Sequence, residues 1–173
     1  MGKLGVEMII IFRGKAATGK SMMAKQINEG LGAEIVSKDS IFDRLLEDGY
    51  SWDEASNIAY DKLASVIQDC HDNKKSLIVD IGLAHTEYFD NFMNKMNLKN
   101  VKKFLFTCSD DSKWESRICK RIENPEVPNQ AFKSIQQARE HYEKYNIIPH
   151  DDELVIDSAD SVESIRKRIL QVL

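Results

Sequence analysis

The sequence predicts an α/β fold, a three-layer α/β/α sandwich around a five-stranded parallel sheet. Two observations carry this prediction. Short, continuous apolar segments recur along the chain, and segments of helical spacing alternate with them, which is the pattern of right-handed βαβ units. The 173-residue length corresponds to one domain spanning residues 1–173.

The predicted strands are runs of four to seven residues rich in β-branched and aromatic side chains. Such runs lack the polar alternation of a half-exposed strand, so they are typical of parallel strands covered on both faces. In chain order they are Met8–Arg13, Glu34–Ser37, Leu77–Asp80, Val101–Thr107 and Leu154–Asp157.

The predicted helices have apolar residues three or four positions apart. The clearest runs from Trp52 to Cys70, and Ser51 with Glu54 forms a capping box at its start. A last helix over Val162–Val172 repeats the spacing. The remaining helices are expected over Ser21–Glu29, Ser40–Glu47, Thr86–Met96, Asp110–Arg121 and Asn129–Tyr145.

Composition excludes several classes of protein. The chain carries 24 Lys and Arg against 28 Asp and Glu, a net charge of −4 that disfavours a general nucleic-acid binder. The apolar run Met8–Phe12 is far shorter than the ~20 residues that span a bilayer, and the first residues lack the apolar core of a secretion signal. Three widely spaced cysteines argue against disulfides and a zinc site. We therefore expect a cytoplasmic protein without a membrane partner.

The strongest motif lies directly after the first predicted strand. Gly14-Lys15-Ala16-Ala17-Thr18-Gly19-Lys20-Ser21 matches G-x-x-x-x-G-K-[ST] at every fixed position and directly precedes a helix. In this P-loop the backbone amides cradle phosphates, Lys20 reaches the β- and γ-phosphates, and Ser21 supplies a hydroxyl to Mg²⁺. The eight residues, with Met22, predict a P-loop NTPase fold that binds ATP and Mg²⁺.

The rest of the sequence narrows the choice among nucleotide-binding proteins. A GTPase is expected to carry N-K-x-D, but the nearest string, Asn94-Lys95-Met96-Asn97, lacks the Asp. An AAA-type motor needs a longer module with a helical extension. The length therefore fits a small kinase best.

The sequence resembles the small P-loop kinases of the zeta-toxin, chloramphenicol phosphotransferase and polynucleotide kinase-like group. The P-loop, Ser37-Lys38-Asp39, Leu77–Asp80, Arg117 with Arg121, and Val155-Ile156-Asp157-Ser158 carry the resemblance in their order and spacing. It implies ATP-dependent phosphoryl transfer to a hydroxyl group, and it covers nearly the whole chain.

Asp39 is the candidate catalytic carboxylate. It follows a predicted strand, so it lies at the edge of a parallel sheet where ligands bind. The resemblance implies that Asp39 accepts the proton of the attacking hydroxyl; the alternative is an N-cap of the helix that begins near Ser40. Polynucleotide kinases usually place an Arg three residues later, where this chain has Phe42, which disfavours a nucleic-acid 5′ end as acceptor.

Asp80 ends the third predicted strand, as a Walker-B carboxylate does. It is a candidate for holding Mg²⁺ through water together with Ser21, or for positioning the acceptor. The alternative is a turn residue before Gly82. The resembled group often continues into Thr-Asn, whereas Ile81-Gly82 follow here.

Arg117 and Arg121 lie four residues apart on one predicted helix face. Such a pair can stabilise charge on a transferring phosphoryl group, and the resemblance implies a lid over about residues 109–130. The alternative is a solvated helix in which these arginines pair with Asp111 and Glu115. Which arginine makes the main contact stays open.

Weaker candidates complete the prediction. The four histidines are expected at surfaces or helix ends, and His85 is the one best placed to face an acceptor. Tyr142 and Tyr145 are expected mainly to contribute to the core, and Asp157-Ser158-Ala159 either contacts adenine or leads into the last helix.

The leading prediction is a kinase for a small-molecule hydroxyl. One alternative is a 5′-polynucleotide kinase that binds phosphates through Lys38 and a cluster of Lys99, Lys102 and Lys103. The other is a switch protein that binds ATP without catalysis. Neither the acceptor nor the oligomeric state follows from the sequence.

Overall fold

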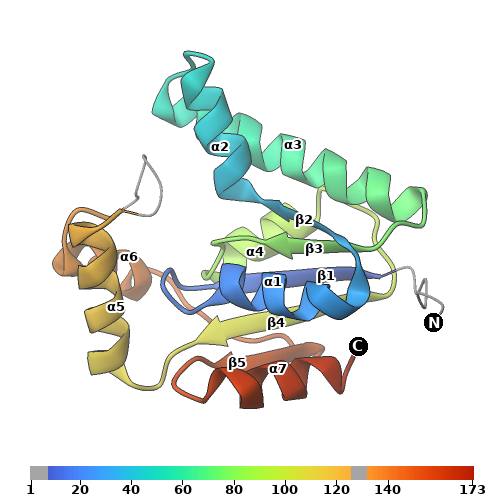
Figure 1. The fold of residues 1–173 in the computed structure, drawn as a ribbon. Helices are drawn as coiled ribbons and strands as arrows, with labels where there is room; N and C mark the ends of the chain where they lie inside the picture. Colours follow the sequence, from blue (N-terminus) through green and yellow to red (C-terminus); the bar gives the residue numbers. More distant parts are fainter. Residues whose placement is uncertain (1–7, 126–131) are drawn as a thin grey trace.

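The computed structural model describes residues 8–125 and 132–173 and contains a five-stranded, all-parallel sheet in the order β2-β3-β1-β4-β5 (Figure 1). This confirms the predicted fold class. The strands are β1 (Ile9–Gly14), β2 (Glu34–Ser37), β3 (Leu77–Asp80), β4 (Val101–Thr107) and β5 (Glu153–Asp157). The helices are α1 (Lys20–Leu31), α2 (Lys38–Glu47), α3 (Trp52–Asp72), α4 (Thr86–Met93), α5 (Asp111–Glu123), α6 (Ile135–Glu143) and α7 (Val162–Leu170).

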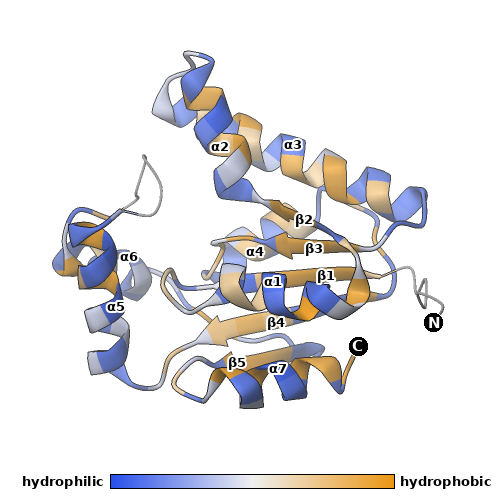
Figure 2. Cartoon of the chain, viewed as in Figure 1, coloured by the Kyte–Doolittle hydropathy of each residue, from blue (hydrophilic) through white to orange (hydrophobic). Residues whose placement is uncertain are grey.

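The alternating side chains of β1 explain the three layers. Ile9 and Ile11 belong to a core with α3 and α4, whereas Ile10 and Phe12 belong to a core with α1 and α7. All six residues of β1 are buried, because this central strand is covered on both faces. The hydrophobic strands and the mixed surfaces of the outer helices are visible in Figure 2.

Most element boundaries agree with the sequence prediction, and the capping box of Ser51 and Glu54 is present. The expectation that every strand is covered on both faces is wrong for the two edge strands. Glu34 and Ile35 of β2 are exposed, and so is Val155 of β5. The predicted start of the sixth helix at Asn129, and part of the predicted lid over 109–130, lie outside the described residues.

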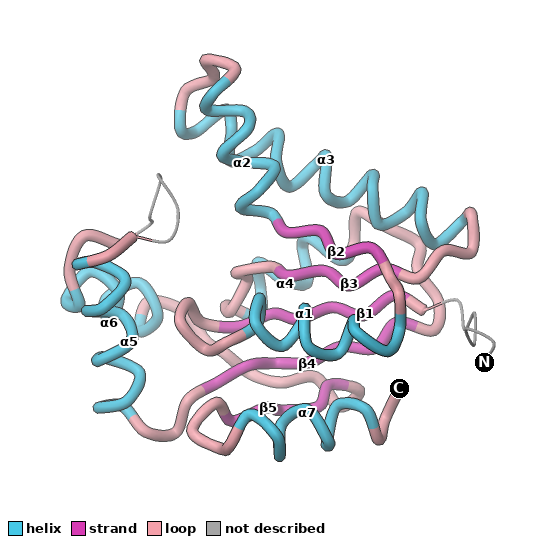
Figure 3. The backbone as a smooth tube through the Cα atoms, viewed as in Figure 1, coloured by secondary structure: helices cyan, strands magenta, loops and turns pink. Residues whose placement is uncertain are grey.

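Two pairs of helices flank the carboxyl ends of the strands. The pair α2 and α3 projects from the β2 side, and the pair α5 and α6 stands beyond the ends of β1 and β4 (Figure 3). Within the described ranges, no helix combines the length and apolar character needed to cross a bilayer.

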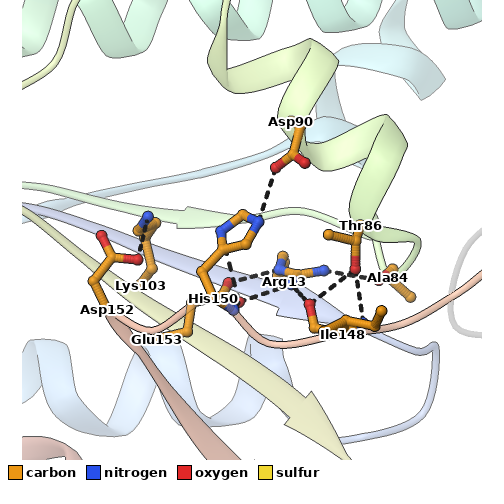
Figure 4. Close-up of polar contacts among 9 residues, drawn as sticks. All are labelled: Arg13, Ala84, Thr86, Asp90, Lys103, Ile148, His150, Asp152 and Glu153. Carbon is orange, nitrogen blue, oxygen red and sulfur yellow. Dashed lines mark hydrogen bonds and ion pairs between the residues drawn. The ribbon is translucent and has the colours of Figure 1, made fainter.

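A buried ion pair links the central strand β1 to the edge strand β5, and the sequence did not predict it. Arg13 is wholly buried and donates to both carboxylate oxygens of Glu153, at 2.6 and 2.7 Å. Its Nη1 donates to the carbonyl oxygen of Ala84 at 2.8 Å, and Nη2, which also bonds Glu153, donates to the carbonyl oxygen of Ile148 at 2.9 Å (Figure 4). The backbone amide of His150 donates to the same carboxylate at 2.8 Å. One guanidinium thus joins β1, β5 and the segments before α4 and β5.

Replacing Arg13 by Met should lower the free energy of unfolding by about 3–5 kcal/mol, because it leaves the Glu153 carboxylate buried without its cation. Urea denaturation measures the change. The double variant Arg13→Met/Glu153→Leu removes both charges and should be more stable than the single variant. A double variant less stable than Arg13→Met would contradict this account of the pair.

Candidate active site

The carboxyl ends of the strands bring the predicted site residues to one edge of the sheet. Ser37 at the end of β2 is paired with Asp80 at the end of β3, and Phe12 of β1 is paired with Asp80 on its other side. On the other half of the sheet, Thr107 is paired with Asp157. The P-loop leaves β1 at this same edge, which is where open α/β sheets bind ligands.

The P-loop needs its glycines for two physical reasons. At Gly14 φ is +139°, and a Cβ there would lie 2.1 Å from the carbonyl oxygen of Phe106 on the neighbouring strand. Gly19 has a φ of +83° and stands at the N-cap of α1. Between them Ala17 also adopts a positive φ of 60°. The loop therefore curls tightly from the end of β1 into the start of α1, with the positive end of the helix dipole at the site.

Lys20 is buried under this loop and points back along it. Its Nζ donates to the carbonyl oxygens of Gly14 at 3.1 Å and Lys15 at 2.7 Å. Burial lowers the pKa of Lys20; the carboxylates of Asp80 and Asp39 oppose this, and Arg121 adds to it. The three groups predicted to act with Lys20 are thus near enough to influence its charge.

Ser21 and Asp80, the two predicted metal ligands, are in direct contact. The Ser21 hydroxyl donates to the Asp80 carboxylate, across 59 positions of sequence. A hydroxyl and a carboxylate are hard oxygen ligands, and Mg²⁺ in phosphate sites takes few such groups, with waters and phosphate oxygens as the rest. The residues present therefore fit Mg²⁺.

Asp39 does not cap α2, so the predicted alternative role is wrong. The helix begins at Lys38, and Ser37 is its N-cap, with the Ser37 hydroxyl accepting from the Ser40 amide at 3.1 Å. The Asp39 carboxylate is 75% exposed, and the Lys38 ammonium lies 3.8 Å from it.

The surroundings of Asp39 suit a proton acceptor. Desolvation raises its pKa, attraction by Lys38 opposes that shift, and repulsion by Asp80 adds to it. The side chain makes no cap contact with α2, and its raised pKa makes it a stronger base than an ordinary aspartate.

The two arginines of α5 have different neighbours. Arg117 donates to the hydroxyl and the carbonyl oxygen of Ser158, both at 2.9 Å, after the end of β5. Arg121 instead lies close enough to Lys20 and Tyr142 to alter their pKa values. Glu115, one of the predicted partners of these arginines, pairs with Arg139 of α6.

A cavity of about 910 Å³ lies between the P-loop, α5 and the start of α7. Both arginines line it together with Thr18, Met22, Ser158 and Asp160. Asp157, next to Ser158, fixes the turn after β5, because its carboxylate accepts from the amides of Ser109 at 3.0 Å and Ala159 at 2.9 Å. The cavity is continuous with the loop that would hold phosphates.

Two aromatic residues, Trp114 and Tyr142, form hydrogen bonds with the backbone of the P-loop. No pattern in the sequence indicated the contact made by Trp114. The Trp114 indole donates to the carbonyl oxygen of Ala16 at 3.0 Å, and the Tyr142 hydroxyl accepts from the Ala16 amide at 2.7 Å. The Lys15 ammonium lies 5.1 Å from the Trp114 ring centre. Burial raises the pKa of Tyr142 to about 12, so this hydroxyl stays protonated. Tyr142 belongs to the core, as predicted, but the same prediction is wrong for Tyr145, which is exposed.

Two other sequence predictions can be compared with the structure. His85 lies at a helix end, as expected, because it is the N-cap of α4, and its side chain is only 3% exposed. The cluster of Lys99, Lys102 and Lys103 lies at the beginning of β4, the edge opposite the P-loop, and Lys103 pairs with Asp152 at 2.7 Å. This cluster therefore lies at the other end of the strands from the P-loop.

A second cavity, of about 740 Å³, lies between α3, α4 and α6. Tyr60 lines it, and the pKa of Tyr60 is raised to about 12 by burial and by the Asp39 carboxylate. The Lys38 ammonium lies 5.4 Å from the centre of the Tyr60 ring and 3.8 Å from the Asp39 carboxylate, which places Asp39 near this cavity. Asp39 also follows Ser37, which is paired with Asp80 in the sheet.

Comparison with known proteins agrees with this geometry. A family model described as "AAA domain" matches residues 9–143. No curated protein sequence matches the chain.

Solved structures with the same fold include three kinases. A sugar kinase from Janibacter sp. has a TM-score of 0.67 at 15% identity, over 95% of this chain and 92% of that one. A gluconokinase from Sinorhizobium meliloti has a TM-score of 0.67 at 13% identity, over 96% and 91%. Shikimate kinase from Acinetobacter baumannii, in complex with shikimate, has 0.59 at 16%, over 99% and 96%. At these identities the likeness establishes a P-loop NTPase-like fold.

Proposed function

The chain belongs to the AAA domain family, and we propose that it transfers the γ-phosphate of ATP to a hydroxyl of a small-molecule acceptor. The observation that carries the proposal is the position of Asp39, which lies near Lys20 and Asp80 on one side and near the second cavity on the other. Kinases for small molecules among the structures of the same fold support it.

The P-loop would hold the triphosphate. Its amides and the start of α1 supply positive dipoles, and Lys20 supplies an ammonium group to the β- and γ-phosphates. When the nucleotide binds, hydrogen bonds from the Lys20 ammonium to phosphate oxygens would replace its bonds to the carbonyl oxygens of Gly14 and Lys15. Ser21 and Asp80 would hold Mg²⁺, which neutralises charge on the phosphates when bound.

Asp39 would orient the acceptor hydroxyl and take its proton. The hydroxyl oxygen forms a bond to the γ-phosphorus while the bond from that phosphorus to the β–γ bridging oxygen breaks, and ADP leaves with that electron pair. Phosphoryl transfer needs mainly positioning and charge stabilisation. A carboxylate with a raised pKa, open to solvent and beside a cavity, meets this need.

Replacing Arg117 and replacing Arg121 should change different kinetic constants. Arg121→Ala should lower kcat by about 10²-fold or more, because a cation near Lys20 stabilises charge that develops in transfer. Arg117→Ala should mainly raise the KM for ATP, because Arg117 fixes the Ser158 segment of the first cavity. Steady-state kinetics with varied ATP measures both values. The reverse pattern would assign the transition-state contact to Arg117.

The test of the function is a screen for transfer of labelled γ-phosphate to pooled metabolites and to oligonucleotides. We expect a labelled small molecule, and no transfer by Lys20→Ala. Label in oligonucleotides alone would support a polynucleotide kinase, and its affinity should then fall steeply with salt. Nucleotide binding without transfer to any pool would support a switch protein.

A further inference from the structure

The side chains that line the second cavity indicate which class of ligand it can bind. It is bordered by neutral hydrogen-bonding side chains from three elements: Ser56 and Asn57 of α3, Tyr88 and Asn91 of α4, and His141 of α6. Tyr60 lies in the lining on the side of Asp39: the Lys38 ammonium is 5.4 Å from the centre of the Tyr60 ring and 3.8 Å from the Asp39 carboxylate.

The two ionised side chains in the lining satisfy each other. Lys95 of the segment after α4 donates to the Asp61 carboxylate of α3. His85 and His141 also line the cavity, and desolvation lowers the pKa of each. Among the lining residues that the structure describes, Lys95 is therefore the one ionised cation, and the Asp61 carboxylate already pairs with it.

His85 offers an unsatisfied polar atom at this place. Within the described residues, its Nε2 is the buried side-chain nitrogen or oxygen without a hydrogen-bond partner. Buried polar atoms normally have partners, and an exception calls for an explanation such as a ligand. The rings around His85 include Tyr88 and Tyr145, at 5.8 and 5.3 Å between ring centres. They are 43% and 37% exposed, so these two of the rings that surround His85 are surface side chains that an incoming group can displace.

We propose that this cavity holds the phosphoryl acceptor, that the acceptor is an uncharged polyhydroxy compound, and that His85 Nε2 bonds one of its hydroxyls. The proposal rests on the proposed function and specifies its substrate class. Hydroxyls both donate and accept, as do the Ser, Asn, Tyr and neutral His groups of the lining. The aromatic rings of Tyr60, Tyr88 and Phe92 offer surfaces for the C–H faces of such a molecule.

The proposal separates this chain from kinases of carboxylate-bearing acceptors such as gluconate and shikimate. A carboxylate placed in this lining would have to compete with Asp61 for Lys95 and would be repelled by the Asp61 carboxylate, so it would gain little in return for its lost hydration. Discrimination against a charged analogue of the same shape should therefore be strong.

Matched probes test the charge. Sorbitol and gluconate differ at one carbon, CH₂OH against a carboxylate, and methyl shikimate and shikimate differ by one esterified charge. Binding of each to the full chain with ADP and Mg²⁺ is measured by ligand-observed NMR. We expect at least one neutral member to bind, with about 10-fold or greater preference over its charged partner. Binding of neither neutral probe, or preference for the carboxylates, would overturn the inference.

Variants of His85 test the contact. His85→Phe keeps a ring but removes the nitrogen, and it should weaken the neutral probe by about 10-fold, raising the acceptor KM more than it lowers kcat. His85→Gln, which restores a polar group near that position, should recover part of the loss. His71→Phe is the matched control, because His71 lies at the far end of α3. Equal binding by His85→Phe and wild type would exclude the contact.

Titration with MgATP separates this inference from the proposed function. Saturable MgATP binding together with a preference for carboxylates would contradict only the acceptor class. Absence of MgATP binding would contradict the proposed function itself.

Discussion

Replacing Lys20 by Ala is expected to abolish phosphoryl transfer, with a fall in kcat/KM of at least about 10³-fold. The ammonium group is buried under the loop and near Asp80, Asp39 and Arg121, so no solvent-exposed cation can replace it. Transfer of labelled γ-phosphate measures the loss, and calorimetry measures the accompanying loss of MgATP affinity.

The matched control is Lys25→Ala, on the exposed face of the same helix. It should retain transfer within about 2-fold, since surface substitutions of this kind change stability by only about 0.5 kcal/mol. Full activity of Lys20→Ala, or equal losses in both variants, would remove Lys20 from the mechanism.

Asp39→Asn is expected to lower kcat by about 10²–10⁴-fold while leaving the Kd for MgATP nearly unchanged. Asn keeps the size and exposure of the side chain but cannot take a proton. The side chain makes no cap contact with α2, where Ser37 has that role, so folding should not change. Asp69→Asn, an exposed residue of α3, is the control.

The pH profile gives Asp39 a second readout. Its base form is active, and desolvation raises its pKa above the ordinary value of 3.8. Acidification therefore protonates Asp39 at a higher pH than an ordinary aspartate, and kcat should fall as the pH drops through that raised pKa. The residual rate of Asp39→Asn should lack this limb. A normal rate in the variant, or an unchanged acid limb, would exclude Asp39 as the base.

The strands and the P-loop could be predicted because their signals are local. An apolar run, a glycine-lysine loop and a capping box each depend on a few adjacent residues, and the structure contains all of them. Parallel topology then brings the ends of β2 and β3 together, which explains why Ser21, Asp39 and Asp80 could be predicted near one another.

The remaining contacts join residues far apart in the sequence, so no local pattern records them. Arg13 was hidden in an apolar run, and its partner Glu153 lies 140 positions away. Trp114 reaches Ala16 across 98 positions. The error about the helix cap has a local cause, because Ser37 and Asp39 are both good N-cap residues. The helix α2 begins at Lys38, so its N-cap is Ser37, two residues before Asp39.

The role of His85 depends likewise on tertiary packing. Its ring is buried by His141, Tyr142 and Tyr145 from the distant α6 region. A single histidine in a sequence gives no sign that one of its nitrogens is left without a partner. Such an atom becomes evident only when the surrounding helices are in place.

Calorimetric titration of the full chain with ATP and Mg²⁺ tests the central claim most directly. The account predicts saturable binding at a single site, lost in Lys20→Ala and kept in Asp39→Asn. Absence of binding by any purine nucleoside triphosphate in the wild-type chain would contradict the P-loop assignment and, with it, the proposed phosphotransferase.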